Sequence, residues 1–306
     1  MNVFFVFSLY ALFASVFTIS KTALEYSAPF FLVGSRMAIA GVLLLSYLFL
    51  FNRPSLSLKK NQIKYLLLLA LFNIYLTNTF EFWGLQYLTS FKACFIYSLS
   101  PFASALLASL LLSEKMSSRK WLGLLIGFAG LTPVLLAQTT AEERAGQFLI
   151  FSWAELAVMG AALCAVYGWI LLKKLVQQEG MSPLMANGAS MLLGGIVSLA
   201  HSFYSESWRP VPVSEYLPFL TCAMVLIVIS NLVCYNLYGW LLRRFSATFM
   251  SFAGLSTPLF TALFGWYFLD EVITWPFYVS LAIVAGGLVI FYQEELKTTA
   301  TPEVAT

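Results

Sequence analysis

The sequence predicts an all-α membrane protein with ten transmembrane helices arranged as two inverted five-helix repeats. Its composition, its apolar runs and an internal repetition support that prediction. Of the 306 residues, 60% are hydrophobic and only 10% are charged, whereas soluble domains carry about 25% charged residues. A soluble fold would leave most of the apolar runs in water, so we expect a lipid bilayer to surround the chain.

Ten apolar runs account for most of the chain, and each reaches the roughly 17–25 residues that a helix needs to cross a bilayer. The predicted helices are 3–20, 29–51, 62–83, 90–112, 121–138, 153–172, 184–204, 217–240, 247–269 and 276–292. The N-terminus lacks the basic start of a cleavable signal peptide, so we expect the first run to remain as a helix. The polar segment 293–306 is predicted to be a short, loose C-terminal tail.

The cationic residues predict that both termini are cytoplasmic, because loops on that side of a membrane are rich in Lys and Arg. With the N-terminus inside, most of the 17 such residues lie in inner connections: Arg53, Lys59, Lys60, Lys64, Lys115, Arg119, Lys120, Lys173, Lys174, Arg243, Arg244 and Lys297. The outer connections hold Lys21, Arg144 and Arg209 and are otherwise acidic. Two termini on one side require an even number of helices, which agrees with ten.

Landmarks in the first half of the chain recur in the second half in the same order. Pro101, Glu114 and Gly130 recur 157 residues later, as Pro258, Glu271 and Gly287. Pro29, Gly34, Met37 and Gly41 recur 154 residues later, as Pro183, Gly188, Met191 and Gly195. The halves are therefore predicted to be 1–150 and 151–306, with five helices each. Because five is odd, the second half must insert upside down, as in many carriers.

These motifs resemble those of the drug/metabolite transporter superfamily, in its EamA-type branch of two five-helix repeats. The resemblance covers nearly the whole chain and depends on three features: Ser100-Pro101 and Thr257-Pro258, the L-x-E triplets ending at Glu114 and Glu271, and glycines in the closing helices. It implies a secondary carrier of the bacterial inner membrane that works by alternating access. More weakly, the aromatics and membrane-buried charges resemble the S-adenosylmethionine carriers of intracellular bacteria, which implies uptake of that metabolite in exchange for S-adenosylhomocysteine.

Three charged residues inside predicted helices are the first candidates for substrate binding. Arg36, Glu81 and Lys92 fall at a similar depth, and charges within the membrane cost at least about 2.5–3.5 kcal/mol and usually mark function. Arg36 suits a carboxylate and Glu81 an ammonium or sulfonium, which together fit a zwitterion. The alternative is a structural ion pair, with Lys92 extending to the interface. Their counterparts in the second half of the chain are uncharged: Ser190, Asn236 and Phe249. We therefore expect an asymmetric site, with its charged residues in the first half.

Amide and aromatic side chains form the second group of candidates. Helical spacing places Asn73 on one face with Glu81 and puts Asn78 beside them, while Asn231, Tyr235 and Tyr238 share a face of the eighth helix. Each amide could instead hold two helices together. Aromatic faces can stack a planar ring or hold a sulfonium. The aromatic candidates are Tyr10, Phe13, Phe17, Tyr97, Trp169, Tyr235 and Tyr238.

Other residues bear on mechanism and on competing functions. Pro101 and Pro258 should kink their helices and could act as hinges. A proton-coupled carrier of amino acids or amphiphilic metabolites, using Glu81 or His201, is the nearest alternative; a membrane enzyme or scaffold is the alternative from another class. The four cysteines form no C-x-x-C pair, so we expect no metal and no disulfide. We also expect no cofactor and no nucleic-acid partner, while the choice between monomer and homodimer stays open.

Overall fold

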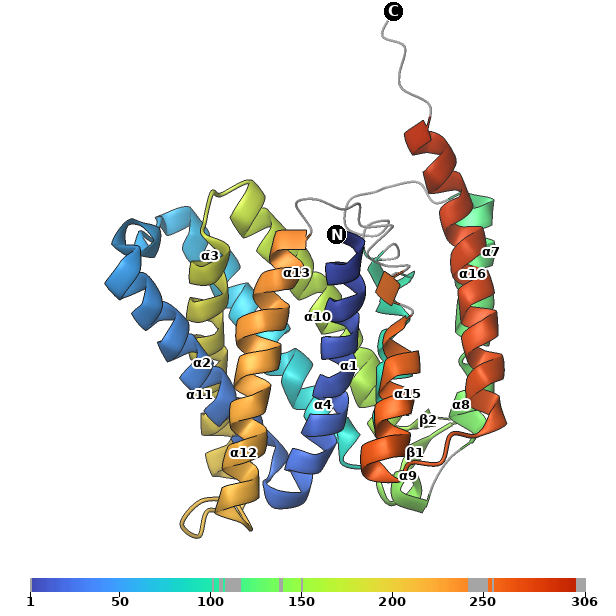
Figure 1. Ribbon diagram of the computed structural model, residues 1–306, viewed down its shortest axis with the longest axis horizontal. Helices are drawn as coiled ribbons and strands as arrows, with labels where there is room; N and C mark the ends of the chain where they lie inside the picture. The colour runs from blue at the N-terminus through green and yellow to red at the C-terminus, as the bar shows by residue number, and fades with distance from the viewer. Residues whose placement is uncertain are drawn as a thin grey trace, which may run out of the picture.

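The computed structural model of the chain is a bundle of long helices (Figure 1). It describes residues 2–100, 102–104, 107, 117–137, 140–149, 151–241, 253–254 and 256–300. Figure 1 shows that α1 begins and α16 ends at the same end of the bundle.

The first half of the chain begins with two long helices and continues with shorter helical elements. They are α1 (Asn2–Tyr26), α2 (Pro29–Phe51), the 3-10 turn η1 (Arg53–Leu56), α3 (Lys60–Leu69), the π-helix η2 (Ala70–Leu76), α4 (Thr77–Leu85), α5 (Ser90–Tyr97), α7 (Ser118–Ala129), α8 (Thr132–Leu136) and α9 (Thr140–Arg144). A small antiparallel hairpin that the sequence did not predict follows, with β1 (Gln147–Phe148) and β2 (Phe151–Ser152).

The second half begins with two long helices and again contains a π-helix. Its elements are α10 (Trp153–Gln177), α11 (Pro183–Ser205), α12 (Tyr216–Leu226), the π-helix η3 (Ile227–Cys234), α13 (Tyr235–Leu241), α15 (Ser256–Leu269) and α16 (Trp275–Ala300). In the bundle, α2 packs along α11, α7 along α16, α10 along α4 and α1 along α15. Apart from the hairpin and one isolated bridge between Ser27 and Val213, the regular secondary structure of the described residues is helical.

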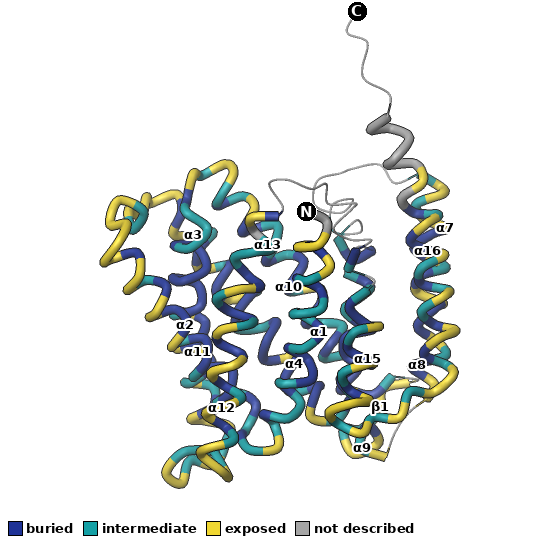
Figure 2. Tube along the Cα trace, in the orientation of Figure 1, coloured by how far each residue is buried: buried dark blue, intermediate teal, exposed yellow. Residues whose placement is uncertain are grey.

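Seven helices among the described residues are long and apolar enough to cross a membrane. They are Phe4–Tyr26, Pro29–Phe51, Lys60–Leu85, Ser118–Leu136, Trp153–Gln177, Pro183–Ser205 and Tyr216–Tyr238, and a shorter apolar helix covers Trp275–Phe291. Many large apolar side chains are exposed, and Figure 2 shows exposed residues along the helices at the edges of the bundle. These properties identify an all-α membrane protein. The structure describes only part of the predicted fourth and ninth helices. For the fourth helix, 90–112, it describes 90–100 (which includes α5), 102–104 and 107. For the ninth helix, 247–269, it describes 253–254 and α15.

Two predicted boundaries are wrong, and one predicted helix is interrupted. The first helix does not end at 20 but continues through Lys21 to Tyr26, because the Lys21 ammonium donates to the carbonyl oxygens of Leu85 and Leu88, at and just beyond the end of α4, instead of entering water. The predicted fifth helix lies within Ser118–Leu136 as expected, but its regular helix is interrupted between Ala129 and Thr132, next to Pro133, which has no backbone N–H to donate. Helix α16 continues to Ala300, so the segment after 292 begins as a helix rather than as a loose tail.

Glycines let α2 and α11 meet at their backbones. A Cβ added to Gly41 would lie 2.5 Å from the backbone nitrogen of Leu192, and one added to Gly195 would lie 2.5 Å from that of Ala38. These two contacts correspond to each other, because Gly195 and Leu192 lie 154 residues after Gly41 and Ala38. No side chain fits between the helices at these points, and glycine is required for the approach.

The pair formed by α7 and α16 shows the same reciprocity. A Cβ on Gly287 would lie 2.7 Å from the nitrogen of Gly127, and one on Gly130 would lie 3.0 Å from the nitrogen of Val284. Here the offset between equivalent residues is 157. Both helix pairs therefore carry matched contacts at the two offsets found in the sequence.

A pattern N-x4-N begins in each π-helix, at Asn73 in η2 and at Asn231 in η3, and ends in the α-helix that follows. In η2 and the start of α4, the side-chain amide of Asn78 donates to the carbonyls of Ile74 (2.8 Å) and Asn73 (3.4 Å). After η3, the amide of Asn236 donates to the carbonyls of Leu232 (2.8 Å) and Asn231 (3.4 Å). A π-helix loosens the regular ladder of backbone hydrogen bonds and often marks a functional site. By contacts, Asn236 corresponds to Asn78, and not to Glu81 as expected from the sequence.

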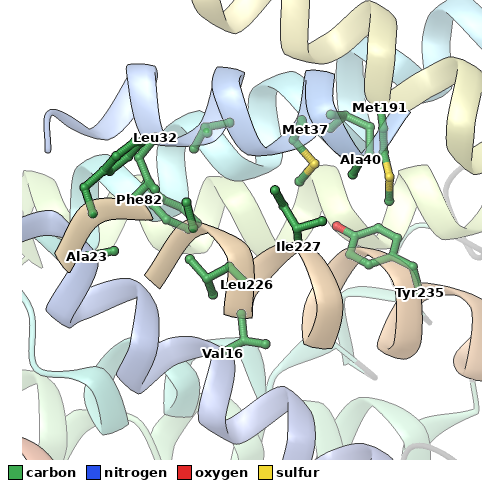
Figure 3. Packing of buried hydrophobic residues seen from close by; sticks show 14 of the residues in the cluster. Val16, Ala23, Leu32, Met37, Ala40, Phe82, Met191, Leu226, Ile227 and Tyr235 are labelled. Atoms are coloured by element: carbon green, nitrogen blue, oxygen red, sulfur yellow. The ribbon is translucent and has the colours of Figure 1, made fainter. Parts of the chain in front are cut away.

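A buried apolar cluster lies between α1, α2, α4, α11 and the π-helix η3. Figure 3 shows Met37 and Met191 close together on one side of this cluster, near Tyr235. Met37 and Met191 are equivalent in the sequence repetition, and both are fully buried. The cluster thus places the centres of α2 and α11 next to the polar residues of the two π-helices.

Candidate substrate site

Arg36 is the centre of the candidate site. Its side chain lies on α2 and is only 2% exposed. Nη2 donates to Oδ1 of Asn78 at 2.6 Å, and Nη1 donates to Oδ1 of Asn231 at 3.4 Å. The guanidinium carbon lies 4.6 Å from the ring centre of Phe82, within cation–π range. Arg36 is therefore held by two amides and an aromatic face, and it bridges α4 and η3.

Asn231 is oriented from both sides. Its oxygen accepts from Arg36, and its amide nitrogen lies 3.0 Å from the sulfur of Met37. Asn78 is held by its own helix as described above, so its oxygen points at the guanidinium. The two amides are neutral, so they do not compensate the charge of Arg36. Arg36 has no carboxylate partner among the described residues, because both ion pairs in that part of the chain are formed by Lys92.

Glu81 lies one turn after Asn78 on α4 and is 8% exposed. Its Oε2 accepts a hydrogen bond from the Tyr97 hydroxyl at 2.8 Å. The Tyr97 ring in turn contacts Phe17, with ring centres 5.6 Å apart. Glu81 interacts electrostatically with Arg36 and Tyr235, but no salt bridge joins it to Arg36 within the described part of the chain. The site thus contains a buried guanidinium and a buried carboxyl group, each held by neutral groups.

An aromatic group lies beside these charges. The Trp169 ring, on α10, is 5.3 Å from the Tyr235 ring and 4.8 Å from the Tyr238 ring. Phe13 contacts Tyr238 at 6.3 Å and Tyr10 at 6.4 Å. Tyr235 interacts with Arg36, Glu81 and Asn78 as well, so it connects the aromatic group to the charges. Such rings can stack a flat ligand.

Lys92 is not brought to Arg36 and Glu81, contrary to the prediction that the three charges converge. Its ammonium, 3% exposed, lies 2.6 Å from Glu142 Oε2 and 2.8 Å from Glu155 Oε1, and both carboxylates are fully buried. Glu155 also accepts from the backbone of Ser152 in a capping box at the start of α10. The sequence analysis missed Glu142 as a partner, because it lies in a connecting segment 50 residues away.

The remaining candidates lie apart or outside the described residues. Asn73 is 2% exposed and packs against Gly168 of α10, without a contact to Arg36. Pro258 is buried in α15. Pro101, Glu114 and Phe249 lie outside the described residues, so the hinge and the first L-x-E glutamate stay predictions.

Glu271 caps a helix in the other half of the chain. Its carboxylate accepts from the backbone N–H (2.6 Å) and the hydroxyl (2.7 Å) of Ser90, at the start of α5. Glu206 does the same for α2, accepting from the N–H groups of Phe30 and Phe31. An anion at a helix N-terminus is favourable, and here it also joins segments from the two halves of the chain.

Chemically, this arrangement suits recognition better than catalysis. The described residues contain no group of three His, Cys, Asp or Glu side chains able to hold a metal. His201 stacks on Phe30, with ring centres 4.2 Å apart, and its Nδ1 lies 3.2 Å from the Tyr75 hydroxyl. Buried charges of both signs, amides and stacked rings can bind a small zwitterion with a flat apolar part.

Comparison with known proteins agrees with this geometry. The chain is 38% identical over 298 residues to the S-adenosylmethionine/S-adenosylhomocysteine transporter of Chlamydia muridarum (strain MoPn / Nigg), covering 97% of this chain and 93% of that one. It is 39% identical to the transporter of the same name from Chlamydia trachomatis serovar L2, covering 97% and 90%. A WAT1-related chloroplastic protein of Arabidopsis thaliana is 26% identical, covering 88% and 63%.

One solved crystal structure superimposes with a TM-score of 0.66, covering 98% of each chain at 14% identity, which shows a shared fold alone. The model of the EamA-like transporter family matches residues 1–136 and 152–293. The family and the relatives are transporters, so the membrane-enzyme alternative is set aside. The chain belongs to the EamA-like transporter family.

Proposed function

We propose that this transporter exchanges S-adenosylmethionine for S-adenosylhomocysteine across a bacterial inner membrane. The observation that carries the proposal is the pair Arg36 and Glu81, which are buried in one site and each lack a counter-charge within bonding distance among the described residues. A buried charge is costly unless it is paired. A ligand that brings both a carboxylate and a cation would supply the missing partners. The names of the chlamydial relatives support this ligand class.

In the proposed complex, Arg36 binds the ligand carboxylate, and Glu81 with Tyr97 receives the ammonium or sulfonium. The flat base stacks among Trp169, Tyr235 and Tyr238. Lys92 is left out of the ligand set, because Glu142 and Glu155 already neutralise it within the protein.

We further propose a ten-helix architecture of two inverted five-helix halves, 1–150 and 151–306. The reciprocal glycine contacts of α2 with α11 and of α7 with α16 support it, because helices related by a twofold axis meet through equivalent residues. The excess of Lys and Arg in alternate connections supports cytoplasmic termini. The start of α1 and the end of α16 also lie at the same end of the bundle (Figure 1). The substrate would alternate between the two sides at the interface of the halves.

The test is counterflow in proteoliposomes with labelled S-adenosylmethionine and internal S-adenosylhomocysteine, against a panel of amino acids and nucleosides. Arg36→Gln and Glu81→Gln should each weaken apparent affinity about 10- to 150-fold, since hydrogen bonds to charged groups contribute about 1.5–3 kcal/mol. Arg53→Gln and Glu215→Gln are matched controls, because both residues are exposed. Normal affinity in both site variants, with intact protein levels, contradicts the proposed site.

The same assay separates the exchanger from a proton-coupled carrier of amino acids or amphiphiles. Substrate-dependent acidification or alkalinisation inside the liposomes, lost in Glu81→Gln, indicates proton coupling. Exchange that proceeds without proton movement supports the proposed function. His201 contacts Phe30 and Tyr75 rather than Glu81, so His201→Gln is expected to leave the exchange intact.

A further inference from the structure

Asn78 and Asn236 present their side-chain oxygens in the same way. Each uses its amide N–H groups on carbonyls of its own π-helix, at 2.8 and 3.4 Å in both cases. The oxygen is therefore directed away from the helix in a fixed orientation. The two π-helices thus provide a matched pair of acceptors, one in each half of the chain.

The two acceptors receive different donors. Asn78 accepts from the guanidinium of Arg36 at 2.6 Å. Asn236 accepts from Nδ2 of Asn187 at 3.2 Å. Asn187 lies on α11 and is only 1% exposed, three residues before Ser190, the repeat equivalent of Arg36. The donor to Asn78 is therefore a charged guanidinium, whereas the donor to Asn236 is a neutral amide.

Asn187 keeps unused hydrogen-bonding capacity. Its side chain offers two N–H donors and one oxygen, and Asn236 takes a single donor. Among the described residues its side chain makes no other hydrogen bond. A buried amide gains from a further partner. The unused N–H donor and the Oδ1 acceptor of Asn187 lie side by side. They match the edge of adenine, where an amino group adjoins an acceptor nitrogen, and asparagine side chains bind this edge in the same way in DNA.

The pair lies next to the aromatic group. Asn236 follows Tyr235 on α13, and Tyr238 lies two residues further. Both tyrosine rings contact Trp169. A base stacked on these rings would have its edge within the reach of α11 and α13, since both helices contact each other.

We infer that Asn187 and Asn236 form a second, uncharged subsite that binds the hydrogen-bonding edge of an aminopurine base stacked on Trp169. This inference rests on the proposed function, and it assigns the base to the second half of the chain and the charged amino-acid end to Arg36 and Glu81. Replacing the base's 6-amino group by a 6-oxo group turns a donor into an acceptor, which would then face the Asn187 oxygen. That change should weaken binding about 5- to 150-fold.

The experiment compares two competitors of labelled S-adenosylhomocysteine counterflow: unlabelled S-adenosylhomocysteine and its 6-oxo analogue, S-inosylhomocysteine. Wild-type protein should prefer the 6-amino compound by the factor above, and Asn187→Leu should bring the ratio close to one. Ser198→Ala is the matched control, because Ser198 is fully buried on the same helix and lies outside the site. It should keep the wild-type ratio. The ratio is measured within one variant, so it does not depend on the amount of folded protein.

Two results overturn the inference. The first is a wild-type protein that exchanges S-adenosylhomocysteine but does not distinguish the two competitors. The second is an unchanged preference in Asn187→Leu, which would make the amide pair a helix contact only. If Asn187→Leu does not fold, Asn187→Ala carries the same test, because it removes both the donor and the acceptor oxygen that would face the 6-position. A wild-type protein that exchanges no S-adenosylhomocysteine at all contradicts the proposed function itself.

Discussion

Replacing Lys92 by methionine tests whether this cation is structural. The ammonium lies 2.6 and 2.8 Å from two carboxylates, and all three side chains are at most 3% exposed. Removing it leaves Glu142 and Glu155 buried and facing each other. Breaking a buried ion pair costs about 3–5 kcal/mol, which lowers the folding equilibrium constant about 10²- to 4 × 10³-fold. We expect Lys92→Met to unfold at a clearly lower denaturant concentration in mixed micelles, followed by tryptophan fluorescence.

A triple variant is the decisive control. Lys92→Met with Glu142→Gln and Glu155→Gln removes every charge of the network, and glutamine at 155 can still complete the capping box with Ser152. It should recover most of the stability, because replacing a whole buried ion network by neutral groups often costs little. The reasoning is refuted if Lys92→Met is as stable as the wild type while its apparent affinity for S-adenosylhomocysteine falls tenfold or more. That outcome would make Lys92 a ligand contact.

Two further changes test helix contacts by melting temperature in detergent. Gly41→Ala places a Cβ 2.5 Å from the backbone of α11 and should cost about 1–3 kcal/mol, whereas Gly286→Ala, with nothing within 4 Å of its Cβ, should leave the melting temperature unchanged or raise it slightly, because alanine favours a helix over glycine; equal effects would contradict the close backbone contact. Glu271→Ala removes the acceptor for Ser90 at the start of α5 and should cost about 0.5–2 kcal/mol, while Glu215→Ala, whose side chain makes no cap hydrogen bond, should have little effect.

Hydropathy and the positions of prolines were sufficient to predict the bounds of the long helices α2 and α11. The predicted helix 29–51 coincides with α2, and 184–204 differs from α11 by one residue at each end. Both begin at a proline, which is favoured in the first turn because its missing N–H is not needed there. The boundary at 20 failed because the three carbonyls that hold Lys21 belong to a segment more than 60 residues away.

The candidate site was predictable in its residues more than in its contacts. Rarity of charge inside apolar runs marked Arg36 and Glu81, and the structure brings both to Tyr235. The same rule also selected Lys92, since hydropathy does not distinguish a charge awaiting a ligand from one neutralised by distant carboxylates. Asn187 was missed because a single asparagine in a helix carries no signal until its partner Asn236 is placed beside it.

The fixed charges of the site add nothing to the net charge that the proposed exchange moves. Arg36 and Glu81 belong to the protein and return to their starting positions in every cycle, so the charge carried across the membrane in one cycle is the difference between the two ligands. S-adenosylmethionine carries one more positive charge than S-adenosylhomocysteine, through its sulfonium. Each inward exchange therefore moves one positive charge down a potential that is negative inside, which contributes about 2.3 kcal/mol per 100 mV. The membrane potential alone would then drive accumulation about 50-fold per 100 mV, without a coupling ion.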